Sequence, residues 1–224
     1  MRPASSRGRV LLAAVAAVAL LVGTAGGYLF GALAPFASSP TPSSNSAEAG
    51  FARDMQVHHL QGAELAMIAR ERSTDDEVLT VSKDILLTQQ QQAGQLFGWL
   101  NSWGLPQAAS EPSMTWMGRP TLAGAADEHS AMGMGTEDGV VPTSMPGLAT
   151  PQQIAALSTA SGRDVDRMFL ELMIAHHRGA IDMAEALLAR SRVGVATDFA
   201  TSVVKAQEAE ISLMEQMLAD RPAE

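Results

Sequence analysis

An internal repeat constrains this chain more than any other feature of its sequence. Residues 51–104 and 169–222 align without a gap at an offset of 118. Each copy carries a Met-x-x-His-His motif near its start: Met55, His58 and His59, then Met173, His176 and His177. These two pairs hold four of the five histidines of the chain. Such a repeat predicts two equivalent units that bury their apolar faces against each other.

The first copy has the pattern of two helices joined by a short turn. Apolar residues recur at helical spacing from Phe51 to Ile68. Thr74 and Glu77 then form a capping-box pattern, which predicts a second helix that ends near Trp103.

The second copy repeats this pattern. Its first helix is expected from about Asp164 to Arg190, and its second, capped by Thr197 or Asp198, to about Ala219. A short helix before it is predicted by Thr150 as N-cap, followed by Pro151 and by Gln153 of a second capping box.

Helices joined by such short turns pack antiparallel. The chain is therefore predicted to be all-α, with a four-helix bundle made of two hairpins. The first hairpin covers residues 48–104, and the second, with its short leading helix, covers 150–222.

The first 47 residues predict an attachment to a membrane. Residues 1–9 hold three Arg, residues 10–36 are apolar and uncharged, and residues 37–47 form a Ser/Pro linker. A single-pass transmembrane helix with its N-terminus inside a bacterial cell and the domain outside is expected. The alternative is a signal peptide, cleaved after Ala34, that would release a secreted form.

The amino-acid composition excludes several kinds of site and partner. The chain has no Cys, which excludes disulfides and thiolate metal sites, and it has 24 Asp and Glu against 15 Lys and Arg. An acidic surface attracts cations and repels nucleic acid. No nucleophile–base pair or phosphate-binding loop is recognisable, so we expect neither an enzyme nor an organic cofactor.

The histidine pairs are expected on the buried side of their helices. On a helical wheel His177 shares a face with Met173 and Ala184, while His176 lies beside Met183. Hairpin geometry places His59 level with about Gln90, inside the run 89–92, and His177 level with about Glu208, inside the run 207–210. Amide or carboxylate groups are therefore expected opposite the imidazoles, with Gln89 and Gln92 as candidates in the first copy and Gln207 and Glu210 in the second.

Thioether and imidazole ligands without thiolate suit Cu(I) or Ag(I). Zn(II) rarely takes a thioether. A di-iron bundle would have Glu three residues before His, where this chain has Met55 and Met173. The alternative is that the histidines are hydrogen-bonded core residues and the methionines ordinary packing.

The connecting segment, residues 105–149, is a second candidate for metal binding. It is rich in Pro, Gly, Ser and Thr, and its possible ligands are Met114, Met117, His129, Met132 and Met134. The alternative is a linker whose methionines pack on the bundle.

Residues 145–188 resemble the domain of unknown function 305 family, whose pattern is an MPGM-like stretch, a short helix, and then Met-Ile-x-His-His-x-Gly-Ala-Ile-x-Met-Ala. The resemblance covers about residues 51–220 and implies a ferritin-like four-helix fold. Some members are exported copper- and silver-binding proteins. Carried over by position, it implies these ligands: Met173, His176, His177 and Met183, with Met55, His58 and His59 in the first copy. The first copy departs from the pattern, because Leu65 stands where the second has Met183.

The sequence thus predicts a membrane-anchored, outward-facing protein that binds Cu(I), and also Ag(I), for sequestration or delivery. The alternative is a non-catalytic interaction module of the cell envelope, with structural histidine pairs and a protein partner or a second copy of itself. A redox metalloenzyme is a third hypothesis, and the few carboxylates near the histidines disfavour it.

Overall fold

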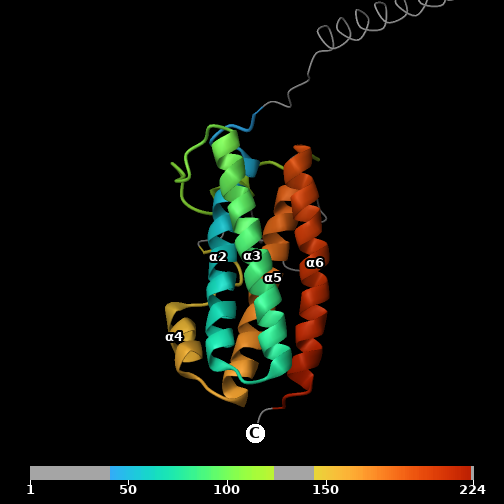
Figure 1. Ribbon diagram of the computed structural model, residues 1–224. Helices are drawn as coiled ribbons and strands as arrows, with labels where there is room; N and C mark the ends of the chain where they lie inside the picture. The colour runs from blue at the N-terminus through green and yellow to red at the C-terminus, as the bar shows by residue number, and fades with distance from the viewer. Residues whose placement is uncertain (1–40, 124–143, 223–224) are drawn as a thin grey trace, which may run out of the picture. The chain divides into compact units, whose positions relative to one another are not determined.

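The computed structural model describes residues 41–123 and 144–222, and helices are the regular elements within these two ranges. Four long helices run side by side (Figure 1): α2 (Ala47–Arg72), α3 (Asp76–Ser102), α5 (Arg163–Leu188) and α6 (Gly194–Ala219). The 3-10 turn η1 (Thr115–Gly118) and the short helix α4 (Pro151–Thr159) lie between the two hairpins in the chain. The predicted all-α bundle is confirmed.

Capping groups explain where the helices begin, and they correct two predictions. The capping box of α4 is present: Thr150 Oγ1 accepts from Gln153 N at 3.2 Å, and the Gln153 side chain accepts from Thr150 N at 2.8 Å. At α3 the predicted Thr74–Glu77 box is wrong. Asp75 is the N-cap, and its carboxylate accepts from the backbone of Glu77 and Val78, a role in which Asp outranks Thr.

Helix α6 begins earlier than predicted. Its N-cap is Val193, without a side-chain cap, so Thr197 and Asp198 lie inside the helix rather than before it. The turn is held instead by Ser191, whose Oγ accepts from Val193 N at 3.1 Å.

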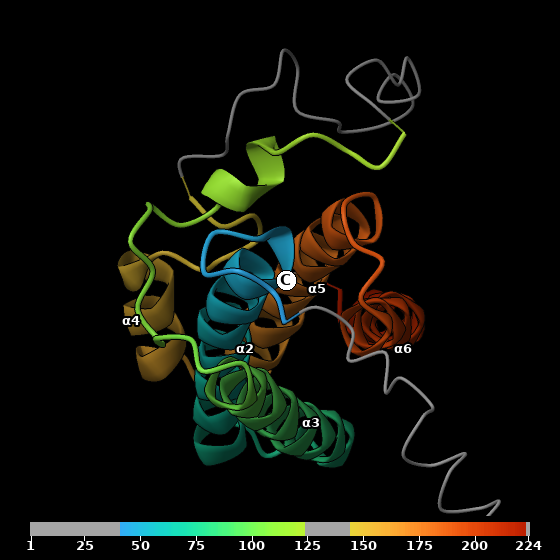
Figure 2. The same ribbon diagram turned by 90° about the horizontal axis from the view of Figure 1, so that it is seen from above.

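The two hairpins are joined through their first helices. Helix α3 packs on α2, α6 packs on α5, and α2 and α5 pack on each other. Seen from above, α2 and α5 form the middle of the bundle, with α3 and α6 beside them (Figure 2). Helices α3 and α6 come close to each other at few points at most, so one long side of the bundle is grooved.

The repeat seen in the sequence is also a repeat of contacts. Ser73 follows α2 and donates to Asp166 at 2.5 Å, near the start of α5. At the other end of the bundle Ser191 follows α5 and donates to Glu48 at 2.5 Å, near the start of α2. These two pairs are equivalent at the offset of 118, so the two halves are related by an approximate two-fold axis that crosses the bundle.

The core consists of two apolar clusters separated by a polar layer. One cluster gathers around Phe51, Leu96, Leu187 and Phe199, and the other around Leu65, Ile85, Phe169 and Met214. On each long helix the residues between the clusters are polar and buried: His58 and His59, Gln89, His176 and His177, and Gln207. The bundle therefore holds its polar side chains in one layer near its middle.

The predicted transmembrane segment, residues 10–36, lies outside the described residues. Among the helices that are described, none is long and apolar enough to cross a membrane.

Candidate metal centre

The four paired histidines lie together in the polar layer. All four side chains are 0% exposed. His58 on α2 and His176 on α5 face each other across the two-fold axis, with ring centroids 3.9 Å apart and ring planes inclined by 38°. His59 and His177 flank them, with centroid distances of 6.3 and 6.1 Å to their chain neighbours. The two copies of the motif thus form one cluster rather than two separate sites.

Hydrogen bonds fix the tautomers of two of these rings. His58 Nε2 lies 3.0 Å from the carbonyl oxygen of Pro146, and His176 Nε2 lies 2.8 Å from the carbonyl oxygen of His58. A carbonyl can only accept, so in each ring Nε2 carries the proton and donates. The lone pair of each neutral ring is therefore on Nδ1.

The third ring is held by a carboxylate. His177 Nε2 lies 2.6 Å from Glu210 Oε2, in the contact predicted from hairpin geometry. The carboxylate accepts from Nε2–H, and Nδ1 of His177 has no hydrogen-bond partner. Three of the four histidines thus use Nε2 to orient the ring.

No hydrogen-bond donor among the described residues reaches the remaining nitrogens. Nδ1 of all four histidines is buried without a partner, and both ring nitrogens of His59 lack one. The side-chain oxygens of Gln89 and Gln207 are buried and unpartnered as well. An unsatisfied buried polar group costs about 1–3 kcal/mol. The layer therefore holds several buried electron-pair donors, among them Nδ1 of His58 and His176, that no hydrogen bond satisfies.

Burial favours the neutral form of three of these rings, those of His58, His59 and His176. It lowers the pKa of His58 from 6.5 to about 4, and the hydrogen bond to Pro146 opposes this fall. Burial also lowers the pKa of His59 and His176 well below 6.5, and mutual repulsion with the neighbouring histidines adds to the effect. Neutral imidazole is the form that binds a metal ion.

Gln89 and Gln92, the predicted polar partners in the first hairpin, do not take the role that Glu210 has in the second. The oxygen of Gln89 is buried without a partner, and so are both ring nitrogens of His59. Gln92, which corresponds to Glu210 in the repeat, is half-buried and forms no hydrogen bond with a histidine. The second hairpin alone gives its histidine a carboxylate.

The predicted thioether ligands lie on both sides of the histidine layer. Met55 and Met183 belong to the cluster around Phe51, and Met173 belongs to the cluster around Phe169. All three are 0% exposed. Met173 and Met183 are ten residues apart in one helix, about 15 Å at 1.5 Å per residue, so one ion cannot bind both.

The carboxylates of the described residues do not complete a metal site with these histidines. Within residues 41–123 and 144–222, no three His, Asp or Glu side chains gather closely enough to hold a metal ion by themselves. A metal ion in the layer would therefore need thioether ligands as well.

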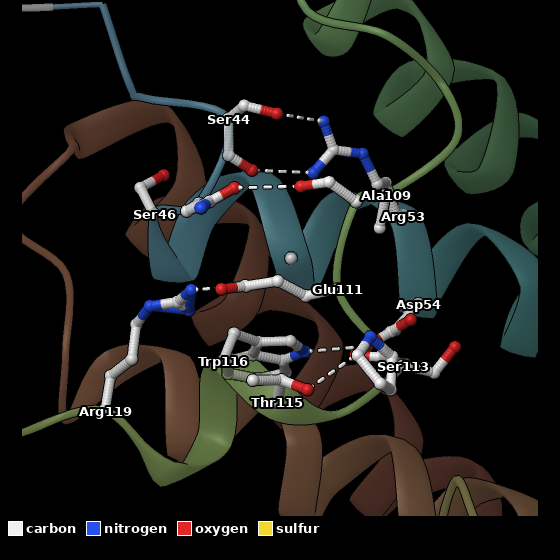
Figure 3. A pocket seen from close by; sticks show the side chains of 14 residues that line it. Ser44, Ser46, Arg53, Asp54, Ala109, Glu111, Ser113, Thr115, Trp116 and Arg119 are labelled. Atoms are coloured by element: carbon white, nitrogen blue, oxygen red, sulfur yellow. Dashed lines mark hydrogen bonds and ion pairs between the residues drawn. The ribbon is translucent and has the colours of Figure 1, made fainter.

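Part of the connecting segment packs on the bundle. Met114 is 0% exposed and Trp116 2% exposed, and both join the cluster that contains Met55 and Met183. The indole N–H of Trp116 donates to Oδ2 of Asp54 at 2.9 Å (Figure 3). The backbone N–H of Met114 donates to the same oxygen at 2.7 Å. Met114 is thereby brought to the bundle with its sulfur in the core, and Met117 is partly buried against the same cluster. The remaining predicted ligands of this segment, His129, Met132 and Met134, lie outside the described residues.

Two glycines, Gly62 and Gly179, make room for this arrangement. A Cβ on Gly179 would lie 2.0 Å from the oxygen of Pro146, the atom that accepts from His58. A Cβ on Gly62 would lie 2.7 Å from His176 Cε1 and 2.8 Å from Gln89 Oε1. The turn at Pro146 and Gly147, where Gly147 has φ +74°, thus sits directly on α5.

The comparison with known families agrees with this helical architecture. The sequence profile of the domain of unknown function DUF305 matches residues 48–218. The chain belongs to the DUF305 family. No relative was found among the curated proteins.

Solved structures include other DUF305 proteins. One from Streptomyces coelicolor is 40% identical, with a TM-score of 0.68 over 81% of this chain and 98% of that chain. A DUF305 fragment from Deinococcus radiodurans is 31% identical, with a TM-score of 0.58 over 78% of this chain and 96% of its own.

A more distant likeness is to CopM, whose structures include a Cu(I)-bound and a silver-bound form. The Cu(I)-bound form is 22% identical, with a TM-score of 0.53 over 78% of this chain and 96% of that chain. The form soaked in silver is 18% identical, with a TM-score of 0.55 over 80% of this chain and 98% of that chain. At these identities the likeness bears on the fold alone.

Proposed function

We propose that this DUF305 protein binds Cu(I), and also Ag(I), in its histidine layer, either to sequester the ion or to deliver it to a partner. The observation that carries this proposal is the buried set of Nδ1 atoms, one on each paired histidine, that no hydrogen-bond donor among the described residues reaches. A cation satisfies several electron-pair donors at once, so it would remove the cost of leaving them unpaired.

The ligand types favour a soft monovalent ion. The pairs His58/His59 and His176/His177 would supply imidazole nitrogen. Because no three histidines or carboxylates of the described residues gather closely enough to hold an ion, thioether sulfur would complete the site, from Met55 and Met183 on one side or from Met173 on the other. Neutral nitrogen and sulfur ligands without a thiolate suit Cu(I) and Ag(I). CopM, which shares the fold, is known in copper-bound and silver-bound forms, and this supports the same class of ion.

The orientation of the rings fits such a site. A metal-bound histidine usually donates its second N–H to a carbonyl or carboxylate, which fixes the tautomer. Pro146, the backbone of His58 and Glu210 supply these acceptors to His58, His176 and His177.

The location and the absence of catalysis are part of the proposal. The apolar residues 10–36, preceded by three Arg, would anchor the domain on the outer side of a bacterial membrane. The protein would hold and release the ion without catalysing a reaction, since its paired histidines are fully buried in the core and the sequence shows no nucleophile–base pair.

The test is an anaerobic Cu(I) titration of the full chain in detergent against a chromogenic Cu(I) chelator. A variant with all four paired histidines changed to Gln is compared with His129→Gln, which changes the one histidine outside the pairs. Circular dichroism confirms that each variant is folded.

We expect tight binding in the wild type and in His129→Gln, and its loss in the four-histidine variant. Tight binding that survives in that variant would exclude the histidine layer as the site. No binding by the folded wild type would instead favour the alternative, in which ordered water donates to the ring nitrogens and the pairs are structural parts of an interaction module.

A further inference from the structure

The proposed site raises the question of how an ion reaches it. The four histidines are 0% exposed, and the two apolar clusters close the bundle above and below them. A charged ion does not cross an apolar core readily. An access route therefore has to approach the layer from the side of the bundle.

Glu210 connects the buried layer with solvent. Its Oε2 lies 2.6 Å from Nε2 of the fully buried His177, while 28% of its own side chain is exposed. Pro146 and His58, the other groups that bond a paired histidine, do so through backbone carbonyls. Within the described part of the chain, Glu210 is thus the charged side chain that touches a histidine of the layer.

Glu210 also lines the groove between α3 and α6. This groove has a volume of about 470 Å³, and its carboxylates are Asp76, Glu77, Asp84 and Glu210. No Lys or Arg lines it. Arg221 pairs with Glu77 at 2.9 Å, so the other three carboxylates have no Lys or Arg partner among the described residues, and Glu210 pairs with His177 alone.

The carboxylates are arranged along the groove rather than at one point. Asp76 is the first residue of α3, and Asp84 lies two turns further along, about 12 Å at 1.5 Å per residue. From the antiparallel α6, Glu210 lines the same groove together with Leu213 and Met217. A line of negative charge thus leads from the end of the bundle to the side chain that bonds His177.

The repeat supplies an internal comparison. At the position of Glu210 the first hairpin has Gln92, which lines a second groove between α3 and α6 with Gln91, Gln95 and Asp198. That groove is mainly amide-lined and its Gln92 contacts no histidine. The two halves therefore each carry a histidine pair, but the grooves on the two sides of α3 and α6 differ in charge.

We propose that the acidic α3–α6 groove is the loading route for the ion and that Glu210 is its inner station, where a soft cation passes from solvent to the histidine layer. This inference rests on the proposed function. Carboxylate oxygen is a hard ligand that holds Cu(I) or Ag(I) weakly, so Glu210 passes the ion on rather than keeping it. Clefts lined by one sign of charge raise on-rates by about 10 to 1,000-fold.

The test measures loading and release rates of Ag(I), which needs no reductant, on the full chain in detergent. The buffer contains nitrate because chloride precipitates the ion. Protein and Ag(I) are mixed rapidly, quenched with excess chelator after a set time, and separated by gel filtration for silver analysis. Release is followed by adding chelator to the loaded protein, and the equilibrium Kd is measured by chelator competition.

Glu210→Gln gives the second hairpin the residue type of the first. Glu208→Gln is the matched control, because it removes the same charge from an exposed position of α6 that does not line the groove. The double variant Asp76→Asn/Asp84→Asn tests the outer part of the route.

A group on the route affects loading and release together and leaves the affinity almost unchanged. For Glu210→Gln we expect both rates to fall roughly tenfold, at the low end of the range for electrostatic steering, with Kd within about threefold of the wild type. The double variant should load more slowly and lose part of the ionic-strength dependence, and Glu208→Gln should behave as the wild type.

Loading of Glu210→Gln at the wild-type rate would overturn the route. A weaker Kd with an unchanged loading rate would overturn it too, because Glu210 would then be a ligand of the bound ion. Failure of the wild type to bind Ag(I) at equilibrium would instead refute the proposed function, and this is read independently of any rate.

Discussion

Gly179 offers the sharpest test of how the histidine layer is built. This residue lies inside α5, and the turn at Pro146 packs directly on its backbone. In Gly179→Ala the new Cβ would lie 2.0 Å from the oxygen of Pro146 and 2.4 Å from its carbonyl carbon. Ordinary contact begins at 3.4 Å, so the turn must retreat by about 1.4 Å. That movement breaks the 3.0 Å bond from His58 Nε2 to the same oxygen.

The expected loss of stability has three parts. Overpacking against backbone costs about 1–3 kcal/mol. The buried N–H of His58, left without an acceptor, costs about 1–3 kcal/mol more. The higher helix propensity of Ala returns about 1 kcal/mol. The free energy of unfolding should therefore fall by about 3 kcal/mol, and Tm by roughly 10 °C for a domain of this size.

Gly98→Ala is the control, because Gly98 lies inside α3 and a Cβ there meets nothing within 4 Å. It should stabilise the protein by about 1 kcal/mol. Both variants are compared by thermal and urea unfolding, followed by circular dichroism. If Gly179→Ala proves as stable as Gly98→Ala, the turn does not pack on α5 as described. In the metal-bound protein, Gly179→Ala should also weaken Cu(I) binding by about 10–100-fold, since His58 loses the group that orients it.

Three further outcomes follow from the structure. The metal-free protein should lose stability as the pH is lowered from 6.5 to about 4. The pKa of His58 is lowered to about 4 in the folded state, so the unfolded chain takes up the proton first. His58 alone should therefore reduce the free energy of unfolding by about 3 kcal/mol over this range. His58→Gln should remove this part of the pH dependence, as measured by urea unfolding at several pH values. Asp54→Ala removes the acceptor of two buried N–H groups. It should lower the free energy of unfolding by about 1–3 kcal/mol and shift the fluorescence of Trp116 to longer wavelength. Unchanged emission would show that the position of the indole does not depend on this carboxylate. Ser73→Ala and Ser191→Ala each remove one of two equivalent hydrogen bonds at opposite ends of the bundle. Each should lower the free energy of unfolding by about 1–2 kcal/mol, and the two effects should add in the double variant. Strong non-additivity would contradict the independence of the two hydrogen bonds.

The sequence predicted the fold well because the relevant signals are local. Helical periodicity, short turns and the repeat at an offset of 118 identify four long helices and their pairing into hairpins. Helix starts were predicted less well. Thr74 and Asp75 are adjacent and both can cap, and the backbone geometry of the turn decides between them in favour of Asp75. At α6 the turn depends on Ser191, which also bonds Glu48 in the other half of the chain.

The grouping of the candidate site could not be predicted from the sequence. The repeated motif indicates the two histidine pairs, and hairpin geometry brings His177 level with the run 207–210, in which Glu210 forms the hydrogen bond. The stacking of His58 on His176 depends on how the two hairpins pack, which no local pattern encodes. The acceptor for His58 is a carbonyl 88 residues away, and a backbone oxygen leaves no signature in side-chain types.

The methionines show the same limit of sequence reasoning. Helical spacing placed Met173 and Met183 on the buried side of one helix, where both are found. Their separation along the helix puts them in different apolar clusters, and Met183 instead shares its cluster with Met55 and Met114. Thioether ligands for one ion would therefore come from both halves of the chain and from the connecting segment.

The most direct measurement of metal binding through Nδ1 is the nitrogen-15 NMR spectrum of the imidazoles, before and after one equivalent of Ag(I). In the metal-free protein His58 and His176 should show the proton on Nε2 and a free lone pair on Nδ1. Addition of Ag(I) should shift the Nδ1 resonances of the paired histidines and leave those of His129 in place. Stoichiometric uptake of Ag(I) without any shift of these Nδ1 resonances would contradict a metal centre in the histidine layer.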